Sequence, residues 1–304
     1  MSEPASETGP VVVGYDGSPS GDDALALAVA CFRVLATRLV VAVVHPSPAA
    51  ISPARVDAEW VADRHRVAEE ILEAAKQRLA ATPDVDVPVE YQIVASSSAA
   101  HGLHDLAETV GASLIVVGSR GGGPEERLFA GSTAERLLSG SLCPVGVAPA
   151  GLRDHPPSQV RCVGLAYIDA PEARAALGLA ARLAQRLSVE LRLYTVVADE
   201  AEMLPLGIFR DAERVFLAGA REEYQKAIEA AIAQLPEGVR ATGQILTGEV
   251  VEVLAEQVAK DVDVLFCGSR GYGPVRRVLL GGVSSRLVRR ARSPLVVVPR
   301  GADT

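Results

Sequence analysis

The sequence lacks three features that would each place the protein in a distinct class. Its four cysteines, Cys31, Cys143, Cys162 and Cys267, are scattered without C-x-x-C spacing, which favours reduced thiols in a cytosolic protein over a disulfide framework. No apolar run approaches the roughly 18–20 residues that a membrane-spanning helix needs. The first ten residues, Met1–Pro10, are polar and acidic, unlike a secretory signal. We therefore expect a soluble, cytoplasmic protein with no membrane partner.

The chain also lacks a surplus of basic residues and two common nucleotide-binding signatures. With 30 Lys and Arg against 38 Asp and Glu, the formal charge is −8, which argues against a general nucleic-acid partner. Neither a Walker loop (G-x-x-x-x-G-K-S/T) nor a G-x-G-x-x-G fingerprint occurs. The sequence therefore lacks the motifs that would indicate a P-loop NTPase or a dinucleotide-binding fold.

A glycine pattern occurs twice in the chain, 150 residues apart. The first copy is Gly118-Ser119-Arg120-Gly121, nine residues and Gly131-Ser132; the second is Gly268-Ser269-Arg270-Gly271, nine residues and Gly281-Gly282. Each copy follows a short apolar run and precedes an amphipathic segment. A strand, a glycine loop and a helix N-terminus direct backbone N–H groups at an anion, usually a phosphate. The duplication indicates two repeated domains, each with a candidate nucleotide site.

The repeat divides the chain near its middle. A length of 304 residues fits two domains of about 150 residues each. We place the first domain at residues 1–150 and the second at residues 151–304. The segment Pro149–Ser158 contains Pro156-Pro157 and has no periodic apolar face, so it is the expected linker.

Strand and helix patterns alternate in the same order in both halves. Strands are expected at Val11–Tyr15, Leu39–Val44, Val87–Val94, Ser113–Val117, Val145–Ala148, Cys162–Ala166, Val189–Val197, Ala241–Leu246, Val264–Cys267 and Leu295–Val298. Helices are expected at Ser20–Thr37, Ala54–Ala81, His101–Val110, Ser132–Leu138, Glu172–Leu187, Asp211–Gln234, Val250–Lys260 and Ser284–Arg292. The alternation predicts an α/β fold of two repeated doubly wound domains, each a parallel sheet with helices on both faces. The glycine loops then lie at the carboxyl ends of strands, where such sheets bind ligands.

The glycine loop of the first half has the residues that a phosphate site requires. Glycines in Gly118–Gly123 allow close backbone approach and positive φ, and Arg120 either adds positive charge or is solvated. Ser132 and Thr133, after Gly131, place hydroxyls and free N–H groups at the start of the next helix, where the helix dipole favours an anion. The alternative is that the glycines form turns and Ser132 only caps the helix. The full spacing and its duplication favour the phosphate site.

A second candidate group follows the first strand, in Tyr15-Asp16-Gly17-Ser18-Pro19. Strands one and four of a doubly wound sheet are neighbours at the switch point, so Asp16 is expected across the crevice from Gly118. A carboxylate there accepts hydrogen bonds from a ribose hydroxyl or a base amine. An Asx turn or a helix N-cap would explain Asp16 equally well, and spacing does not choose between these roles.

Together, the G-x-x-G, nine residues, G-S/T pattern and Asp16 resemble the universal stress protein family in its tandem form, with two domains in one chain. The likeness covers nearly the whole sequence. It implies a five-stranded parallel sheet in each domain, in the strand order 3-2-1-4-5. In the nucleotide-binding branch of the family it also implies ATP or AMP at the loop, with or without Mg²⁺.

Carried over to this sequence, the resemblance assigns a part of the nucleotide to each candidate residue. It gives the phosphates to Gly118, Gly121, Gly131, Ser132 and Thr133. Asp16 would meet the adenosine, and the backbone at the end of the second strand, Val44 or His45, would touch the base. The side chain of His45 is expected to point into the same crevice.

The second half departs from the family pattern in its glycine loop. Gly268, Gly271 and Gly281 keep the loop backbone, but Gly282 replaces the serine. Ser284 follows closely and is the candidate to substitute for the missing hydroxyl.

The aspartate position of the second half is also altered. Aligning Ser18-Pro19 with Ala170-Pro171 places Ile168 opposite Asp16, with Asp169 one residue late. A one-residue slip in a strand turns a side chain to the other face of the sheet. The second site is therefore expected to be weaker, altered or empty.

The leading hypothesis is an adenine-nucleotide-binding stress-response protein whose nucleotide state alters its shape or contacts. The alternatives are a nucleotide-independent interaction module and a slow ATPase. The sequence shows no set of attacking water, base and Mg²⁺ ligand, so any hydrolysis should be slow or incidental. His101 and His104 lack further ligands at a recognisable spacing and are expected to be surface residues, not a metal site.

The resemblance also suggests how the halves associate. The last strands, Val145–Ala148 and Leu295–Val298, are short and apolar, and such edges invite pairing. We expect them to pair edge to edge, so that the two halves form a pseudo-two-fold pair. A homodimer of the whole chain is expected in addition.

Overall fold

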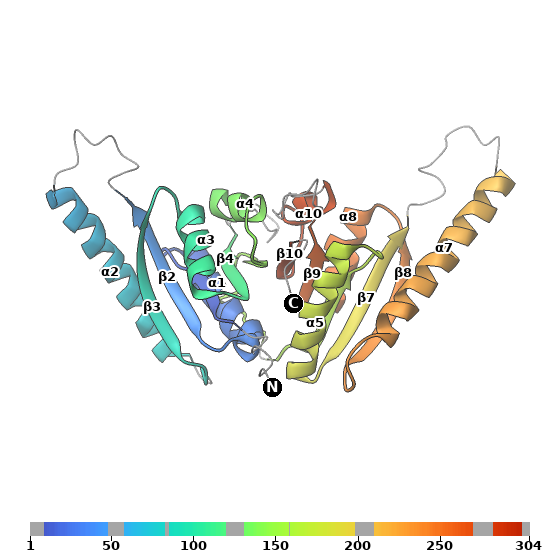
Figure 1. Ribbon diagram of the computed structural model, residues 1–304, viewed down its shortest axis with the longest axis horizontal. Coiled ribbons are helices and arrows are strands. Elements are labelled where there is room, and N and C mark those ends of the chain that lie inside the picture. Colours follow the sequence, from blue (N-terminus) through green and yellow to red (C-terminus); the bar gives the residue numbers. More distant parts are fainter. Residues whose placement is uncertain are drawn as a thin grey trace, which may run out of the picture.

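The computed structural model describes residues 9–47, 58–82, 85–119, 131–157, 159–197, 210–269 and 282–299 of the 304-residue chain. Within these residues, strands and helices alternate along the chain, and ten strands form one sheet. Figure 1 shows the two halves side by side, the first in blue to green and the second in yellow to red.

The first half contains the elements that its alternating pattern predicts. Its strands are β1 Val11–Gly14, β2 Leu39–Pro46, β3 Val89–Ser96, β4 Leu114–Gly118 and β5 Val145–Ala148. Its helices are α1 Pro19–Leu27, α2 Ala58–Ala80, α3 Ala99–Val110 and α4 Ser132–Leu138. The short helical segments η1 Ala28–Phe32 and η2 Arg33–Leu35 follow α1 directly.

The second half repeats this order. Its strands are β6 Cys162–Ala166, β7 Glu190–Val197, β8 Arg240–Thr247, β9 Val264–Gly268 and β10 Leu295–Val298. Its helices are α5 Pro171–Leu187, α7 Arg210–Ala233, α8 Val250–Glu252, the π-helical segment η5 Val253–Val258, α9 Ala259–Asp261 and α10 Gly282–Leu287. Among the described residues, no helix combines the length and apolar character that a membrane crossing requires.

The sheet joins the two halves through their last strands. Its strand order is β3-β2-β1-β4-β5-β10-β9-β6-β7-β8, so each half has the predicted order 3-2-1-4-5 and the second half mirrors the first. Pairing is parallel within each half and antiparallel between β5 and β10, where Val296 lies opposite Gly146. The predicted fold class and the predicted edge-to-edge pairing are both confirmed. Pairing these edges also removes two strand edges from solvent.

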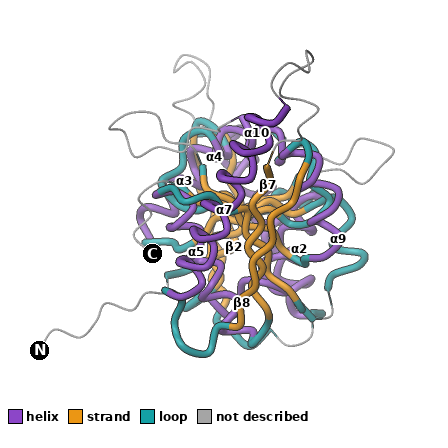
Figure 2. Tube along the Cα trace, turned by 90° about the vertical axis from the view of Figure 1, so that its right-hand side faces the viewer, coloured by secondary structure: helices purple, strands orange, loops and turns teal. Residues whose placement is uncertain are grey.

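Each face of the sheet has its own hydrophobic core. Successive strand residues alternate between faces, so Val11 and Val13 pack in the core beneath α1 and α2, whereas Val12 packs in the core beneath α3. Figure 2 shows the strands in the middle of the molecule with helices on either side. Both cores contain residues of both halves; Phe32 and Phe266, for example, belong to the same cluster. The two halves therefore pack as one unit.

Three predicted helices differ from the observed ones. The helix predicted at Ser20–Thr37 is α-helical only to Leu27 and continues as the π-helical η1 and the 3₁₀ turn η2. The helix predicted at Val250–Lys260 also contains a π-helical segment, and the one predicted at Ser284–Arg292 ends at Leu287. In η1 almost every side chain is buried, so the sequence there shows no alternation of polar and apolar faces from which the number of residues per turn could be read. A run of this kind does not reveal where the helical repeat changes.

A buried carboxylate in α1 fixes the chain between the halves. Asp23 is 1% exposed; its oxygens accept hydrogen bonds from the backbone N–H of Gly151 (3.1 Å) and of Arg153 (2.8 Å). The guanidinium of Arg153 approaches the same carboxylate to 3.0 Å. Gly151 has a φ of +85°, which a residue with a side chain rarely adopts. The linker therefore begins as an ordered turn attached to the first half.

We expect Asp23→Ala to lower the free energy of unfolding by about 2–3 kcal/mol, because it leaves buried backbone donors without an acceptor. Urea denaturation of the full chain measures this loss. The control is Asp154→Ala, since Asp154 lies 3.3 Å from the same Arg153 but is 60% exposed. That variant should lose less than about 0.5 kcal/mol, as exposed pairs generally do. Equal losses in the two variants would contradict the role given to Asp23.

Candidate functional site

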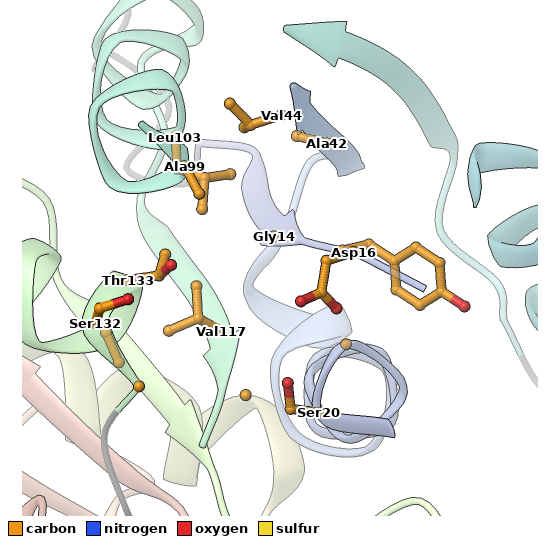
Figure 3. Close-up of a pocket in the computed structure, with 15 residues that line it drawn as sticks. Gly14, Asp16, Ser20, Ala42, Val44, Ala99, Leu103, Val117, Ser132 and Thr133 are labelled. Atoms are coloured by element: carbon orange, nitrogen blue, oxygen red, sulfur yellow. The ribbon is translucent and has the colours of Figure 1, made fainter. Parts of the chain in front are cut away.

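A cleft opens at the carboxyl ends of β1 and β4, the switch point of the first half. These strands are parallel neighbours, and the helices that follow them leave in opposite directions from this edge. The cavity measures about 150 Å³ and has the start of α1 on one side and the start of α4 on the other (Figure 3). A doubly wound sheet offers a ligand its most accessible crevice at this point.

Asp16 lies at the edge of this cleft and also forms the turn that begins α1. Its Oδ1 accepts hydrogen bonds from the backbone N–H and the hydroxyl of Ser18, at 3.0 Å and 2.5 Å. Gly17, between them, has a φ of +74°, and Ser18 caps α1 by accepting from the N–H of Gly21 at 3.3 Å. The Asx turn is therefore present. Both bonds use Oδ1, so the turn does not occupy Oδ2.

The residue beside Asp16 anchors this turn to the neighbouring helix. Tyr15 donates a hydrogen bond to Asp22 at 3.0 Å, and Asp22 lies 2.6 Å from the guanidinium of Arg78 on α2. Burial, and then the neighbouring Asp22, raise the pKa of the Tyr15 hydroxyl. Tyr15 therefore remains protonated at neutral pH and keeps its hydrogen bond to Asp22.

Gly118 ends β4 where the strand touches the first turn of α1. A Cβ at this position would lie 1.9 Å from the backbone oxygen of Ser20, closer than any real contact. The glycine is therefore required for the packing of strand against helix, whether or not a phosphate binds nearby. Gly268 repeats the arrangement, since its Cβ would lie 2.7 Å from the backbone of Glu172.

The start of α4 forms the polar wall opposite Asp16. Gly131 is the N-cap and has no side chain to accept from the first N–H groups of the helix. Ser132 and Thr133 follow it and line the cleft. Figure 3 shows both side chains at the start of α4, next to Val117 of β4. Unpaired N–H groups and two hydroxyls at a helix N-terminus are suited to an anion.

Apart from Ser20 on α1, the rest of the cleft is apolar. Ala42 and Val44 on β2, Ala99 and Leu103 on α3, and Val117 on β4 line it. In Figure 3, Ala42, Val44, Ala99 and Leu103 lie above the polar groups, and Val117 lies between Ser132 and Asp16. The cleft thus has a polar end at α4 and an apolar end between β2 and α3. Sequence reasoning missed Ala99 and Leu103, although their i, i+4 spacing places them on one face of α3.

The structure places only one of the two candidates at the end of β2 in the cleft. Val44 lines it, whereas His45 is buried, with its ring 5.8 Å from that of His65 on α2 and its Nδ1 3.1 Å from the carbonyl of Pro46. Adjacent strand residues point to opposite faces, and His65 lies on the face away from α3. The expectation that the His45 side chain points into the crevice is therefore wrong.

The remaining candidates have different outcomes. Arg120, Gly121, Gly271 and Gly281 lie outside the described residues. His101 and His104 on α3 lie 3.6 Å from Asp105 and 3.7 Å from Glu108, and the described part of the chain contains no group of three or more residues able to hold a metal.

In the second half, the counterpart of the Asp16 turn has changed its contacts. Ile168 occupies the position of Asp16, as the alignment predicts, and is 46% exposed. Asp169, one residue later, accepts a hydrogen bond from the Tyr167 hydroxyl at 3.3 Å and pairs with Arg174 at 2.7 Å. Its carboxylate is therefore engaged in an ion pair. Ser284 is buried on α10 and lines the cavity of the second half.

Comparison with known proteins identifies the family. The model of the universal stress protein family matches residues 7–149 and again residues 162–299. The chain belongs to the universal stress protein family. Its tandem arrangement follows from the double match and from the two mirrored halves of the sheet.

Two relatives and a solved structure of the family match the chain over different lengths. Universal stress protein Rv2319c of Mycobacterium tuberculosis is 30% identical over 302 residues, covering 95% of this chain and 99% of its own. Universal stress protein Rv1996 of the same species is 34% identical over 143 residues, 42% of this chain and 45% of its own. A universal stress protein from Archaeoglobus fulgidus has a TM-score of 0.70 at 21% identity and covers 97% of this chain and 100% of its own.

We expect Gly118→Ala to destabilise the protein by roughly 2 kcal/mol, because the added methyl group would overlap the α1 backbone. Thermal unfolding in the absence of nucleotide measures the change. Gly140→Ala is the matched control: its Cβ would meet only the Arg136 carbonyl oxygen, at an ordinary 3.6 Å. A Gly118→Ala variant as stable as the wild type would refute the packing role.

Proposed function

We propose that the protein binds an adenine nucleotide, ATP or AMP, in the cleft of its first half and acts in the stress response through this binding. The observation that carries the proposal is the arrangement of the cleft, in which Asp16, Ser20, Ser132 and Thr133 surround a space whose other walls are mainly apolar. A nucleotide has parts that match this arrangement: anionic phosphates, a ribose with hydroxyl groups, and a flat apolar base.

The phosphates fit the α4 end of the cleft. The N–H groups after Gly131 and the hydroxyls of Ser132 and Thr133 supply donors, and the helix dipole adds a favourable field. None of the described lining residues at this end is a carboxylate. The polyphosphate would lie along the open side, between the starts of α1 and α4, where Mg²⁺ could accompany it.

The nucleoside fits the other end. Oδ2 of Asp16, which the Asx turn leaves unused, is available to accept from a ribose hydroxyl. The base would lie between Val44 on β2 and Leu103 on α3, covered by apolar side chains. A cavity of about 150 Å³ suits the ring, with the phosphates extending from it.

We propose binding without efficient catalysis. Phosphoryl transfer requires a positioned nucleophile, a residue to orient it and usually a metal ligand. Asp16 is the one carboxylate among the described lining residues, and its Oδ1 is committed to the turn. Turnover at an ordinary enzyme rate would overturn this part of the proposal and support the ATPase alternative.

Calorimetry with ATP and with adenosine tests the two ends of the cleft separately. The double variant Ser132→Ala with Thr133→Val should weaken ATP binding at least tenfold, since each hydrogen bond to a charged group contributes about 1.5–3 kcal/mol. Adenosine, which lacks phosphate, should bind this variant as it binds the wild type. Asp16→Asn should weaken both ligands.

Ser139→Ala is the matched control, because Ser139 lies at the opposite end of α4 and its hydroxyl donates to the Glu135 carbonyl at 2.7 Å. This variant should bind ATP normally. Failure of the wild-type protein to bind either ligand would favour the nucleotide-independent interaction module. Unchanged ATP binding in both cleft variants would place any nucleotide site elsewhere.

The homodimer stays a prediction. The edges β5 and β10 are already paired within the chain, so β3 and β8 are the outer strands of the sheet. A solution mass near twice 31.8 kDa by light scattering would support a dimer of the chain, and a mass of a single chain would refute it.

A further inference from the structure

The second half has a cavity at the place that corresponds to the nucleotide cleft. It measures about 270 Å³ and lies at the carboxyl ends of β6 and β9. Its framework positions correspond to those of the first cleft: Gly268 to Gly118, Leu254 to Leu103, and Val196 to Val44. The two halves therefore present one cavity each, built on the same elements.

The polar positions of the first cleft have a different character in the second half. At the corresponding positions of the second half, Ile168 replaces Asp16, Glu172 replaces Ser20, Gly282 replaces Ser132, and Val283 replaces Thr133. Three of the four changes replace a carboxylate or a hydroxyl with an apolar residue or a glycine. The fourth replaces the Ser20 hydroxyl with the Glu172 carboxylate in the cavity lining, where it would repel a phosphate.

The walls of the second cavity have also gained apolar surface. Tyr194 on β7 occupies the position of Ala42, and Tyr224 on α7 adds a second ring. Burial raises the pKa of the Cys267 thiol on β9 to about 12, so this lining residue stays uncharged. Apart from the hydroxyls of Ser284 and of the tyrosines, the cavity therefore offers aromatic and aliphatic contacts where the first cleft offers Asp16, Ser132 and Thr133.

The entrance of the cavity exposes apolar side chains to water. Among the described residues, three large hydrophobic side chains are exposed: Ile168 at 46%, Leu142 at 42% and Tyr224 at 37%. Ile168 and Tyr224 both line this cavity. Apolar side chains gathered at the mouth of a concave site are typical of ligand-binding pockets.

We propose that the second cavity binds a small aromatic ligand that carries no phosphate and is either neutral or has a nitrogen that donates a hydrogen bond to Glu172. Glu172 is the one carboxylate among the described lining residues, and none of the ion pairs found between described residues involves it. An apolar protein cavity of about 150 Å³ holds benzene, so about 270 Å³ accommodates a larger ring system. This site functions independently of the nucleotide cleft.

Two fluorescent probes with one aromatic skeleton test the proposal. N-phenyl-1-naphthylamine is neutral and has an N–H donor, and 8-anilinonaphthalene-1-sulfonate adds a single anionic group to it. The neutral probe should bind the full chain saturably, and the sulfonate should bind at least about tenfold more weakly because of Glu172. Glu172→Gln should reduce this difference by strengthening the binding of the sulfonate.

Ile168→Asp should weaken the neutral probe about tenfold or more, because it places a charge at the apolar entrance. Leu142→Asp is the matched control: it makes the same kind of change at a similarly exposed residue that does not line the cavity, and it should leave probe binding unchanged. Circular dichroism of both variants confirms that they fold.

Three results would overturn the proposal: no saturable binding of the neutral probe, equal affinity for the two probes in the wild type, or equal effects of Ile168→Asp and Leu142→Asp. Saturating ATP should not displace the neutral probe. The double variant Ser132→Ala with Thr133→Val should bind the probe as the wild type does. A failure of nucleotide binding in the first half therefore leaves this test unaffected.

Discussion

The close approach of a strand end to the first turn of a helix underlies the whole arrangement. At Gly118, and again at Gly268, the strand backbone lies so near the helix that a Cβ would be 1.9 Å or 2.7 Å from helix backbone atoms. This contact places the start of α1 or α5 directly beside the carboxyl edge of the sheet. The crevice at each switch point exists because the helix is held there. The pairing of β5 with β10 then joins the two crevice-bearing halves in one sheet.

On this shared backbone the two cavities have acquired different side chains. Asp16 and Thr133 surround the first with hydrogen-bonding groups, and Ile168 and Val283 replace them in the second. None of these changes disturbs a strand or a helix, because each affected residue lies at the end of an element. A duplicated fold can therefore keep its packing while its two sites change in chemistry. We therefore propose one nucleotide site and one apolar site in the same chain, because the residues that line the cavities can change while the strands and helices that carry them stay the same.

Much of the fold could be predicted from the sequence, because the repeat of Gly118–Gly121 and the alternation of elements each report on backbone geometry. The replacement of Asp16 by Ile168 was also visible, since Pro19 and Pro171 fix the alignment. The orientation of His45 was not, because it depends on which face of β2 each residue occupies where the strand ends. The packing role of Gly118 was hidden for a different reason: the helix that it touches lies about a hundred residues earlier, and one motif cannot show that contact.

The most direct test of the account is a crystal structure of the full chain grown with ATP and Mg²⁺, in which occupied sites are counted. The account predicts one nucleotide per chain, with its phosphates at Ser132 and Thr133 and its ribose at Asp16. The cavity lined by Ile168 and Val283 should contain no nucleotide. Nucleotide in the second cavity, or a first cleft that stays empty at millimolar ATP, would contradict it.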